Sequence, residues 1–222
     1  MILGISGSPR IGNNTEAAVK KILQECEKRG EKTEFISLSG KRISGCISCL
    51  GCTGNNECVV NDDFQEIREA LLKADAVVIG APNYYDLPNA TTHAMMERCF
   101  CFRHRSAFLL KDKPIALFST GYSRDEQNSQ TLDIMEKFMV PNNKMKLVSR
   151  FLIGAVSQCY TCEFGKTCKD GNVYKDNGGP VNEITPSMLP LSFMDQPTSI
   201  EKCIETAELL IQNINIFRNS NL

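Results

Sequence analysis

Apolar runs alternate with amphipathic stretches along most of the chain. Strand-like runs occupy residues 1–6, 32–38, 74–82, 114–119 and 146–153. The third run is continuously apolar, as in a parallel strand buried on both faces. Between these runs, apolar side chains recur at helical spacing, for example at Val19, Ile22, Leu23 and Cys26. The pattern predicts a doubly wound, five-stranded parallel sheet in the usual strand order 2-1-3-4-5.

Sequence signals mark the beginnings of two helices. Asp63-x-x-Glu66 and Thr198-x-x-Glu201 each have the spacing of a capping box, and a third, long helix is expected from about Asn89. Cys26 faces the core in the first helix.

The alternation of strands and helices stops after residue 153. The following stretch contains Gly178-Gly179-Pro180 and three further prolines, but it also holds three cysteines. We therefore expect three parts: an α/β domain (1–153), an ordered cysteine-containing extension (154–197) and a C-terminal helix that completes the domain (198–222).

Composition limits the classes of partner. The 222 residues are 42% hydrophobic with a formal net charge of −1, so no electrostatic reason exists to expect nucleic acid or an acidic membrane surface as a partner. No segment approaches ~20 unbroken apolar residues, and the chain opens directly into a strand-like run. We expect a cytoplasmic protein. Eleven cysteines are many for a reducing compartment, which favours thiolate–metal chemistry over structural disulfides.

The densest group of cysteines lies between residues 45 and 58, in the loop after the second strand. Its spacing is Cys-x2-Cys-x2-Cys-x5-Cys, formed by Cys46, Cys49, Cys52 and Cys58. Four thiolates in one compact turn suit an iron–sulfur cluster. A zinc site usually takes its sulfurs as two separated pairs, and neighbours in such a run fit disulfide geometry poorly. The spacing favours iron–sulfur over zinc or two disulfides.

Three polar loops follow the carboxyl ends of strands, at residues 6–15, 82–88 and 119–123. In an open parallel sheet such loops meet at one crevice. The first offers Ser6, Ser8, Arg10 and Thr15 at a helix N-terminus, which suits a phosphate dianion. Tyr84 and Tyr85, after Pro82, could flank an isoalloxazine ring, and Thr120-Gly121 could approach its pyrimidine edge. Taken singly each loop could be an ordinary turn; together they predict a flavin mononucleotide (FMN) site.

These motifs carry a family resemblance. Ser6-Gly7-Ser8-Pro9-Arg10 with Asn14-Thr15-Glu16, Pro82-Asn83-Tyr84-Tyr85, and the four-cysteine loop before Asp62-Asp63 together resemble the iron–sulfur flavoproteins, a branch of the flavodoxin-like NAD(P)H-dependent FMN reductase superfamily. The resemblance covers roughly residues 1–153. Asn13 stands where the family commonly has glycine, which asparagine can replace if the backbone there is left-handed.

The resemblance implies a flavodoxin-like fold with two cofactors. It places a 4Fe–4S cluster on the four loop cysteines and FMN at the strand ends, where Asn14 and Asn83 join the cofactor-binding residues named above. It also implies a homodimer or homotetramer in which a cluster of one subunit approaches the flavin of another. The cysteine loop leaves the edge strand, ~10 Å from the flavin position, so we expect it at the subunit interface.

A second cysteine group lies in the extension. Cys159, Cys162 and Cys168 repeat the spacing of the last three loop cysteines but lack a fourth member. Water, His104, Asp170 or a neighbouring subunit could complete a second metal site; free or redox-active thiols are the alternative. Cys99 and Cys101 lie ten or more residues into the third helix, ~15 Å or more from the binding edge, and should be core or helix-end thiols.

The leading functional hypothesis is an FMN-dependent oxidoreductase that passes electrons between cluster, flavin and a redox partner. A ferredoxin-like carrier or NAD(P)H would be the donor, and a small molecule the acceptor. Two alternatives stay open: an NAD(P)H-dependent FMN or quinone-type reductase with a structural metal in the cysteine loop, and a non-enzymatic redox sensor. No residue has a spacing specific to one acceptor.

Overall fold

A parallel sheet forms the centre of the molecule. The computed structural model describes residues 1–122, 129–155, 157–189 and 192–220; residue 123 of the third predicted loop lies outside this part. Five parallel strands have the spatial order β2-β1-β3-β5-β6. Their bounds are β1 Ile2–Ser6, β2 Thr33–Ser37, β3 Ala76–Tyr84, β5 Pro114–Gly121 and β6 Lys146–Gly154. The predicted fold class and the order of the five strands are confirmed.

One strand was not predicted. The two-residue β4 (Leu87–Pro88) turns back and pairs antiparallel with the end of β3, where Asn83 lies opposite Pro88. The segment predicted as a plain loop is therefore a short hairpin at the carboxyl edge of the sheet.

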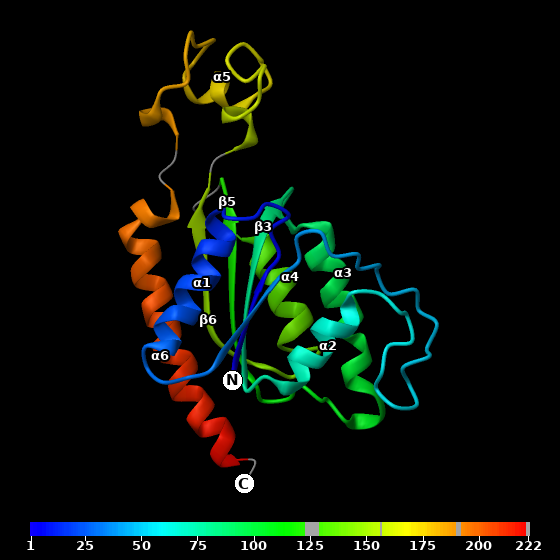
Figure 1. Cartoon of the computed structure of the whole chain (residues 1–222). Helices are drawn as coiled ribbons and strands as arrows, with labels where there is room; N and C mark the ends of the chain where they lie inside the picture. The colour runs from blue at the N-terminus through cyan, green and yellow to red at the C-terminus, as the bar shows by residue number, and fades with distance from the viewer. Residues whose placement is uncertain (123–128, 156, 190–191, 221–222) are drawn as a thin grey trace.

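Helices cover both faces of the sheet (Figure 1). On one face, α1 (Asn14–Glu27) lies beside the long α6 (Pro197–Ser220), and both pack on side chains such as Val78 and Phe118. The other face carries α2 (Phe64–Lys73), α3 (Ala90–Arg98) and α4 (Gln130–Met139), packed on side chains such as Ile79 and Leu117. The sheet thus separates two apolar cores.

Three helix ends differ from the sequence expectation. The Asp63 carboxylate accepts from the backbone N–H of Arg42 at 2.6 Å, and Asp62 instead caps α2 by accepting from the N–H of Phe64 at 3.1 Å. Helix α6 begins at Pro197, so Thr198 lies within its first turn. The third helix is short, because α3 gives way after Arg98 to the 3₁₀ segment η1 (Cys99–Ser106).

The extension stands beyond the carboxyl ends of the strands (Figure 1). It contains η3 (Gln158–Tyr160), α5 (Asn172–Asp176), η4 (Pro186–Met188) and η5 (Phe193–Asp195). Asp176 joins it to the end of β5, because its carboxylate accepts from the hydroxyl of Tyr122 at 2.5 Å; within the extension it also accepts from the hydroxyl of Tyr160 at 2.6 Å. Within the described ranges, no helix combines the length and the apolar character needed to span a membrane.

Candidate functional site

The three predicted loops meet at the carboxyl edge of the sheet. The hydroxyls of Thr15, at the start of α1, and Thr120, at the end of β5, are hydrogen-bonded at 2.6 Å. The loop after β1 turns tightly at Gly7, whose N–H donates to the carbonyl of Gly80 at 2.7 Å. A Cβ at Gly7 would stand 2.0 Å from the Thr92 hydroxyl, so no larger residue fits without movement. Strands β1, β3 and β5 therefore end around one crevice.

The Ser8 side chain fixes the backbone of the β1–α1 loop. The buried Ser8 hydroxyl accepts from the N–H of Arg10 at 3.1 Å and donates to its carbonyl at 3.0 Å, while the Arg10 side chain is exposed. Gly12 takes the left-handed conformation with φ +74°, and Asn13 has an extended backbone with φ −94°. The left-handed backbone considered for Asn13 is thus found one residue earlier, on a glycine.

The tip of the β3–β4 hairpin is strained. Tyr85 and Asp86 have φ values of 56° and 62°, and the Asn83 side-chain carbonyl accepts from the N–H of Asp86 at 2.8 Å. A positive φ is unusual for a bulky aromatic residue and persists only where its surroundings hold it. The Tyr85 side chain is 100% exposed, so the strain presents an aromatic ring at the mouth of the crevice.

Two adjoining cavities fill the crevice. The larger, about 520 Å³, is lined by seven predicted residues, namely Arg10, Pro82, Asn83, Tyr84, Tyr85, Thr120 and Gly121. The smaller, about 130 Å³, is lined by Arg10, Asn14, Thr15 and Thr120. Ser6, at the end of β1, and Ser8, in the loop, are buried and line neither cavity. These volumes suit a small-molecule ligand that places one part in each cavity.

Two of the predicted polar residues, Asn14 and Ser6, differ in their hydrogen bonding. The Asn14 amide donates to the carbonyl of Gly154 and accepts from the N–H of Phe193, both at 3.2 Å, which joins α1 to β6 and the extension. The Ser6 hydroxyl is buried and has no hydrogen-bond partner within the described part of the chain. Ser6 thus keeps an unused polar group close to the loop.

The extension supplies part of the crevice wall that sequence reasoning missed. Ala155, Ser157, Gln158 and Asn172 all line the larger cavity. The hydroxyl of Tyr122, which also lines it, donates to Asp176, and this bond raises the pKa of the tyrosine to about 12. No local motif marks these residues; only the position of the extension over the strand ends does.

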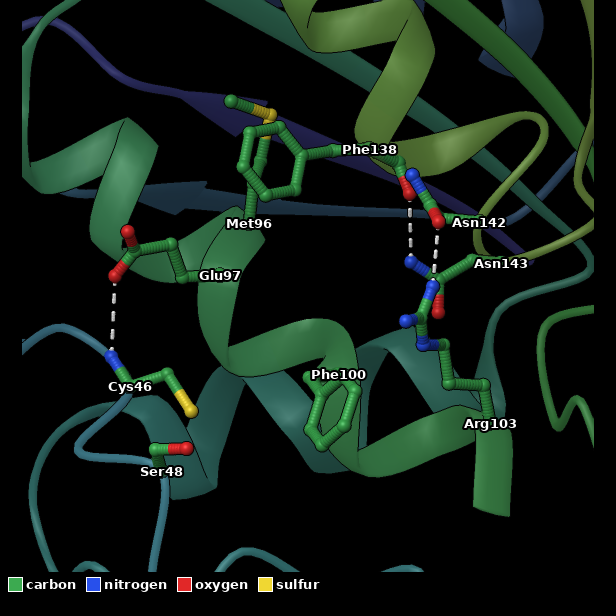
Figure 2. A pocket seen from close by; sticks show the side chains of 9 residues that line it. All are labelled: Cys46, Ser48, Met96, Glu97, Phe100, Arg103, Phe138, Asn142 and Asn143. Carbon is green, nitrogen blue, oxygen red and sulfur yellow. Dashed lines mark hydrogen bonds between the residues drawn. The ribbon is translucent and has the colours of Figure 1, made fainter. Parts of the chain in front are cut away.

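The cysteine loop lies apart from the crevice, against α3 and η1 on the side of the domain (Figure 1). Cys46 and Cys49 are exposed, Cys58 is half-buried and Cys52 is buried. The Glu97 carboxylate accepts from the N–H of Cys46 at 3.1 Å (Figure 2). All four cysteines line one small pocket together with Arg98 and Cys101. The loop packs on its own domain but leaves Cys46 and Cys49 exposed, and its expected place at a subunit interface stays a prediction.

Arg98 organises this loop from beneath. Its side chain is 1% exposed and donates to the Cys58 sulfur at 3.1 Å, the Ser44 carbonyl at 3.0 Å and the Val60 carbonyl at 3.1 Å. It also pairs with Asp62 at 2.7 Å. Burial acts to raise the pKa of Asp62, but Arg98 and donors from Ser44 and Phe64 outweigh it and hold the value at about 2. No sequence motif marks this role of Arg98.

Segment η1 completes the support of the loop. The Nε2 atom of His104 lies 3.0 Å from the Cys52 sulfur, and its backbone N–H donates to the Asn56 side-chain oxygen at 2.8 Å. His104 therefore belongs to the first cysteine group and not to the second, where it was considered as a ligand. Cys99 and Cys101 are buried thiols, as predicted, but Cys101 lies directly under the loop.

The arrangement of the thiols bears on which metal group they could hold. None of the eleven cysteines, all of them in the described ranges, forms a disulfide. Among described residues, no three His, Cys, Asp or Glu side chains converge as a single ion would need. A tetrahedral zinc site requires that convergence, whereas each thiolate of a cuboidal cluster binds its own iron. Four thiols around one pocket suit such a cluster.

The second cysteine group lies in a tight turn of the extension. A Cβ at Gly165 would stand 1.9 Å from the Cys159 carbonyl, so this turn requires glycine. The Cys159 sulfur and the Cys168 Cβ both lie within 3.5 Å of the Cβ position of Gly171, while Cys162 is exposed. Hydrogen bonds from Ser157 and the N–H of Asn172 lower the pKa of Cys159. A metal role for this group stays a prediction.

Comparison with known proteins gives consistent matches. The family model of the NADPH-dependent FMN reductases matches residues 1–157. A protein named iron–sulfur flavoprotein from Methanosarcina thermophila is 33% identical over 138 residues, which cover 62% of this chain and 72% of that protein. Another of that name, from Methanocaldococcus jannaschii, is 32% identical over 139 residues, covering 63% and 71%.

Solved structures agree on the fold. RosB superposes with a TM-score of 0.65 at 11% identity, covering 100% of this chain and 81% of its own. An archaeal flavodoxin superposes with a TM-score of 0.53 at 11% identity, covering 97% and 99%. At such low identity these likenesses concern the fold alone. The sequence matches are the stronger evidence. They show that the chain belongs to the NADPH-dependent FMN reductase family and, within it, to the iron–sulfur flavoproteins.

Proposed function

We propose that this protein is an FMN-dependent oxidoreductase that passes electrons between FMN in the crevice, a 4Fe–4S cluster in the cysteine loop and a redox partner. The observation that carries the proposal is the presence of two separate sites of different chemistry. One is a divided cavity at the strand ends, and the other is a pocket walled by four cysteines. FMN, when bound, supplies the exchange between two-electron and one-electron chemistry, and the cluster supplies single-electron transfer.

The crevice residues have distinct parts in this proposal. Arg10 reaches both cavities, so its guanidinium suits a phosphate at the N-terminus of α1, next to Thr15. Tyr84 and the fully exposed Tyr85 would cover the flavin ring. The backbone of Thr120 and Gly121 would meet its polar edge. Ser8 would act indirectly, because its hydroxyl holds the backbone of Arg10 in place.

The cluster ligands would be Cys46, Cys49, Cys52 and Cys58. Arg98 and His104 touch two of these sulfurs, and the Arg98 cation and hydrogen-bond donor would stabilise a thiolate at Cys58. The alternative in which the loop holds a structural zinc is less well supported, because a zinc site usually takes its sulfurs as two separated pairs and the spacing here is Cys-x2-Cys-x2-Cys-x5-Cys.

The cysteine loop also has the features of a contact surface. Ile47 and Leu50 in the loop, and Val59 directly after it, are 65%, 57% and 61% exposed, which is unusual for three neighbouring apolar side chains. Burial of these side chains against another subunit would remove apolar area from water. We propose that the protein forms a homodimer or homotetramer with this loop at the interface.

The function can be tested by supplying electrons from two donors to wild-type protein and to a Cys49→Ser variant. Cys49 is exposed, so this change should leave the fold and FMN content intact. Anaerobic mixing with reduced ferredoxin should bleach the flavin absorption of wild type much faster than that of the variant. NADPH, which would act at the flavin directly, should bleach both at similar rates. Equal rates with ferredoxin would show that electrons do not pass through the cysteine loop.

A further inference from the structure

A third cavity, of about 380 Å³, lies between the cysteine loop, α3–η1 and the turn after α4. Figure 2 shows its walls. Met96, Phe100 and Phe138 provide apolar surface, and the cysteine loop contributes Cys46 and Ser48. The volume is that of a small-molecule site, and two aromatic rings in its wall suit a flat ligand. It shares no lining residue with the crevice at the strand ends.

One polar group in this cavity is a cation in a fixed position. The Arg103 Nη1 donates to the Asn142 side-chain oxygen at 2.5 Å, and the guanidinium carbon stands 4.8 Å from the centre of the Phe100 ring. Arginine has five N–H donors, and these two contacts fix the plane of the group without using them all. The remaining donors are available for an oxygen of a ligand.

The second polar group is an acceptor without a donor. Asn143 is 3% exposed, and its amide nitrogen donates to the Phe138 carbonyl at 2.8 Å. Its side-chain oxygen is buried and has no hydrogen-bond partner in the described part of the chain. A buried acceptor left unpaired is costly, and such groups are normally satisfied. A ligand with an O–H or N–H group would satisfy it.

The cavity also adjoins the first loop cysteine. Glu97, on α3, accepts from the N–H of Cys46 and so fixes this cysteine at the cavity wall (Figure 2). A ligand in the cavity would therefore lie beside one of the four thiolates proposed to hold the cluster.

We propose that this cavity binds a small planar aromatic of the hydroquinone–quinone class, with one oxygen on Arg103 and one hydroxyl on Asn143. The aromatic walls select a flat ring, Arg103 supplies a donor for a carbonyl or anionic oxygen, and Asn143 accepts a hydrogen bond that only the hydroxylated, reduced form can give. Reduction of the quinone would need two electrons and two protons; FMN held in the crevice would supply the electrons, the four loop cysteines would hold the cluster that passes them singly, and solvent would supply the protons. This redox role rests on the proposed function, whereas the binding does not.

Binding is tested by anaerobic calorimetric titration of the purified holoprotein with naphthohydroquinone sulfonate. An Arg103→Gln variant removes the cation from the cavity. A Lys137→Gln variant is the matched control, because Lys137 is an exposed cation on α4 that lines no part of the cavity. We expect Arg103→Gln to raise the Kd at least about tenfold, as for a lost charge-assisted hydrogen bond, and Lys137→Gln to change it less than about twofold. Equal affinity in all three proteins, or no binding to wild type, overturns the proposal.

A second variant tests the orphan acceptor. Wild type should bind the hydroquinone more tightly than the matching quinone, and Asn143→Leu should abolish this preference. If the preference survives in a folded Asn143→Leu protein, the assignment of Asn143 is wrong. Iron and FMN are measured in the same samples. Full cofactor content without binding would overturn the cavity assignment alone, and binding without iron would overturn the proposed function alone.

Discussion

Loss of Arg98 should affect the cysteine loop far more than the FMN crevice. Its guanidinium makes five hydrogen bonds, which reach Cys58, Ser44, Val60 and Asp62. Arg98→Met keeps the apolar stem and its volume but removes every donor. The change leaves Asp62, only 14% exposed, without its cation.

The expected loss of stability follows from the buried pair of Arg98 and Asp62. Removing one partner of such a pair costs about 3–5 kcal/mol, because the other charge stays partly desolvated. For a domain of this size, each kcal/mol lowers the midpoint of thermal unfolding by about 2–4 °C. Arg98→Met should therefore unfold roughly 6–20 °C lower than wild type, with a lower iron content and near-normal FMN.

The matched control is Arg105→Met. Arg105 reaches the same loop, through the Gly54 carbonyl at 2.5 Å, but its side chain is exposed, so its loss should cost about 1 kcal/mol or less. The assays are scanning calorimetry and the ratio of iron to FMN in anaerobically purified protein. If Arg98→Met and Arg105→Met behave alike, Arg98 does not organise the loop.

Three further predictions concern the crevice, the core and the assembly. Arg10→Ala should lower FMN affinity about 10–100-fold without a comparable loss of stability; unchanged FMN per subunit would exclude Arg10 as a phosphate ligand. Burial lowers the pKa of Lys113 from 10.5, its value in an unfolded chain, to about 8 in the folded protein. Between pH 8 and 10.5 the unfolded chain therefore holds this proton more tightly than the folded protein does, and the free energy of unfolding rises with pH. Relative to Lys113→Met, this rise should reach at most ~3 kcal/mol in urea titrations at pH 8 and 10, and parallel curves would refute it. Anaerobic light scattering should find a dimer or tetramer that Leu50→Asp weakens, and a wild-type monomer would end the interface proposal.

The sequence predicted best what depends on local rules. Apolar periodicity located the five strands, and the rule that parallel strands end at one edge brought Arg10, Tyr84 and Thr120 around one crevice. The cysteine spacing was visible directly. It also located the loop in the chain, between β2 and α2, but not the surface on which it lies.

What the sequence missed depends on contacts between distant segments. Arg98 looks like an ordinary polar residue of an amphipathic helix, and it becomes the centre of the loop only because residues 44–62 fold onto α3. His104 was considered with the extension because both are chemically suited to metal, yet the turn of η1 directs it to Cys52. The Asp63 capping box failed because the Arg42 N–H competes for its carboxylate.

The most direct test of the two proposed cofactors is the cofactor content of anaerobically purified wild-type and Cys49→Ser proteins. Iron, acid-labile sulfide and FMN would be measured per subunit, with Cys203→Ala as the control for loss of a cysteine buried away from the loop. We predict that wild type and Cys203→Ala hold FMN, iron and sulfide. Cys49→Ser should keep FMN and lose most of its iron and sulfide. Wild-type protein with FMN and zinc but no sulfide, or Cys49→Ser with undiminished iron, would contradict this prediction.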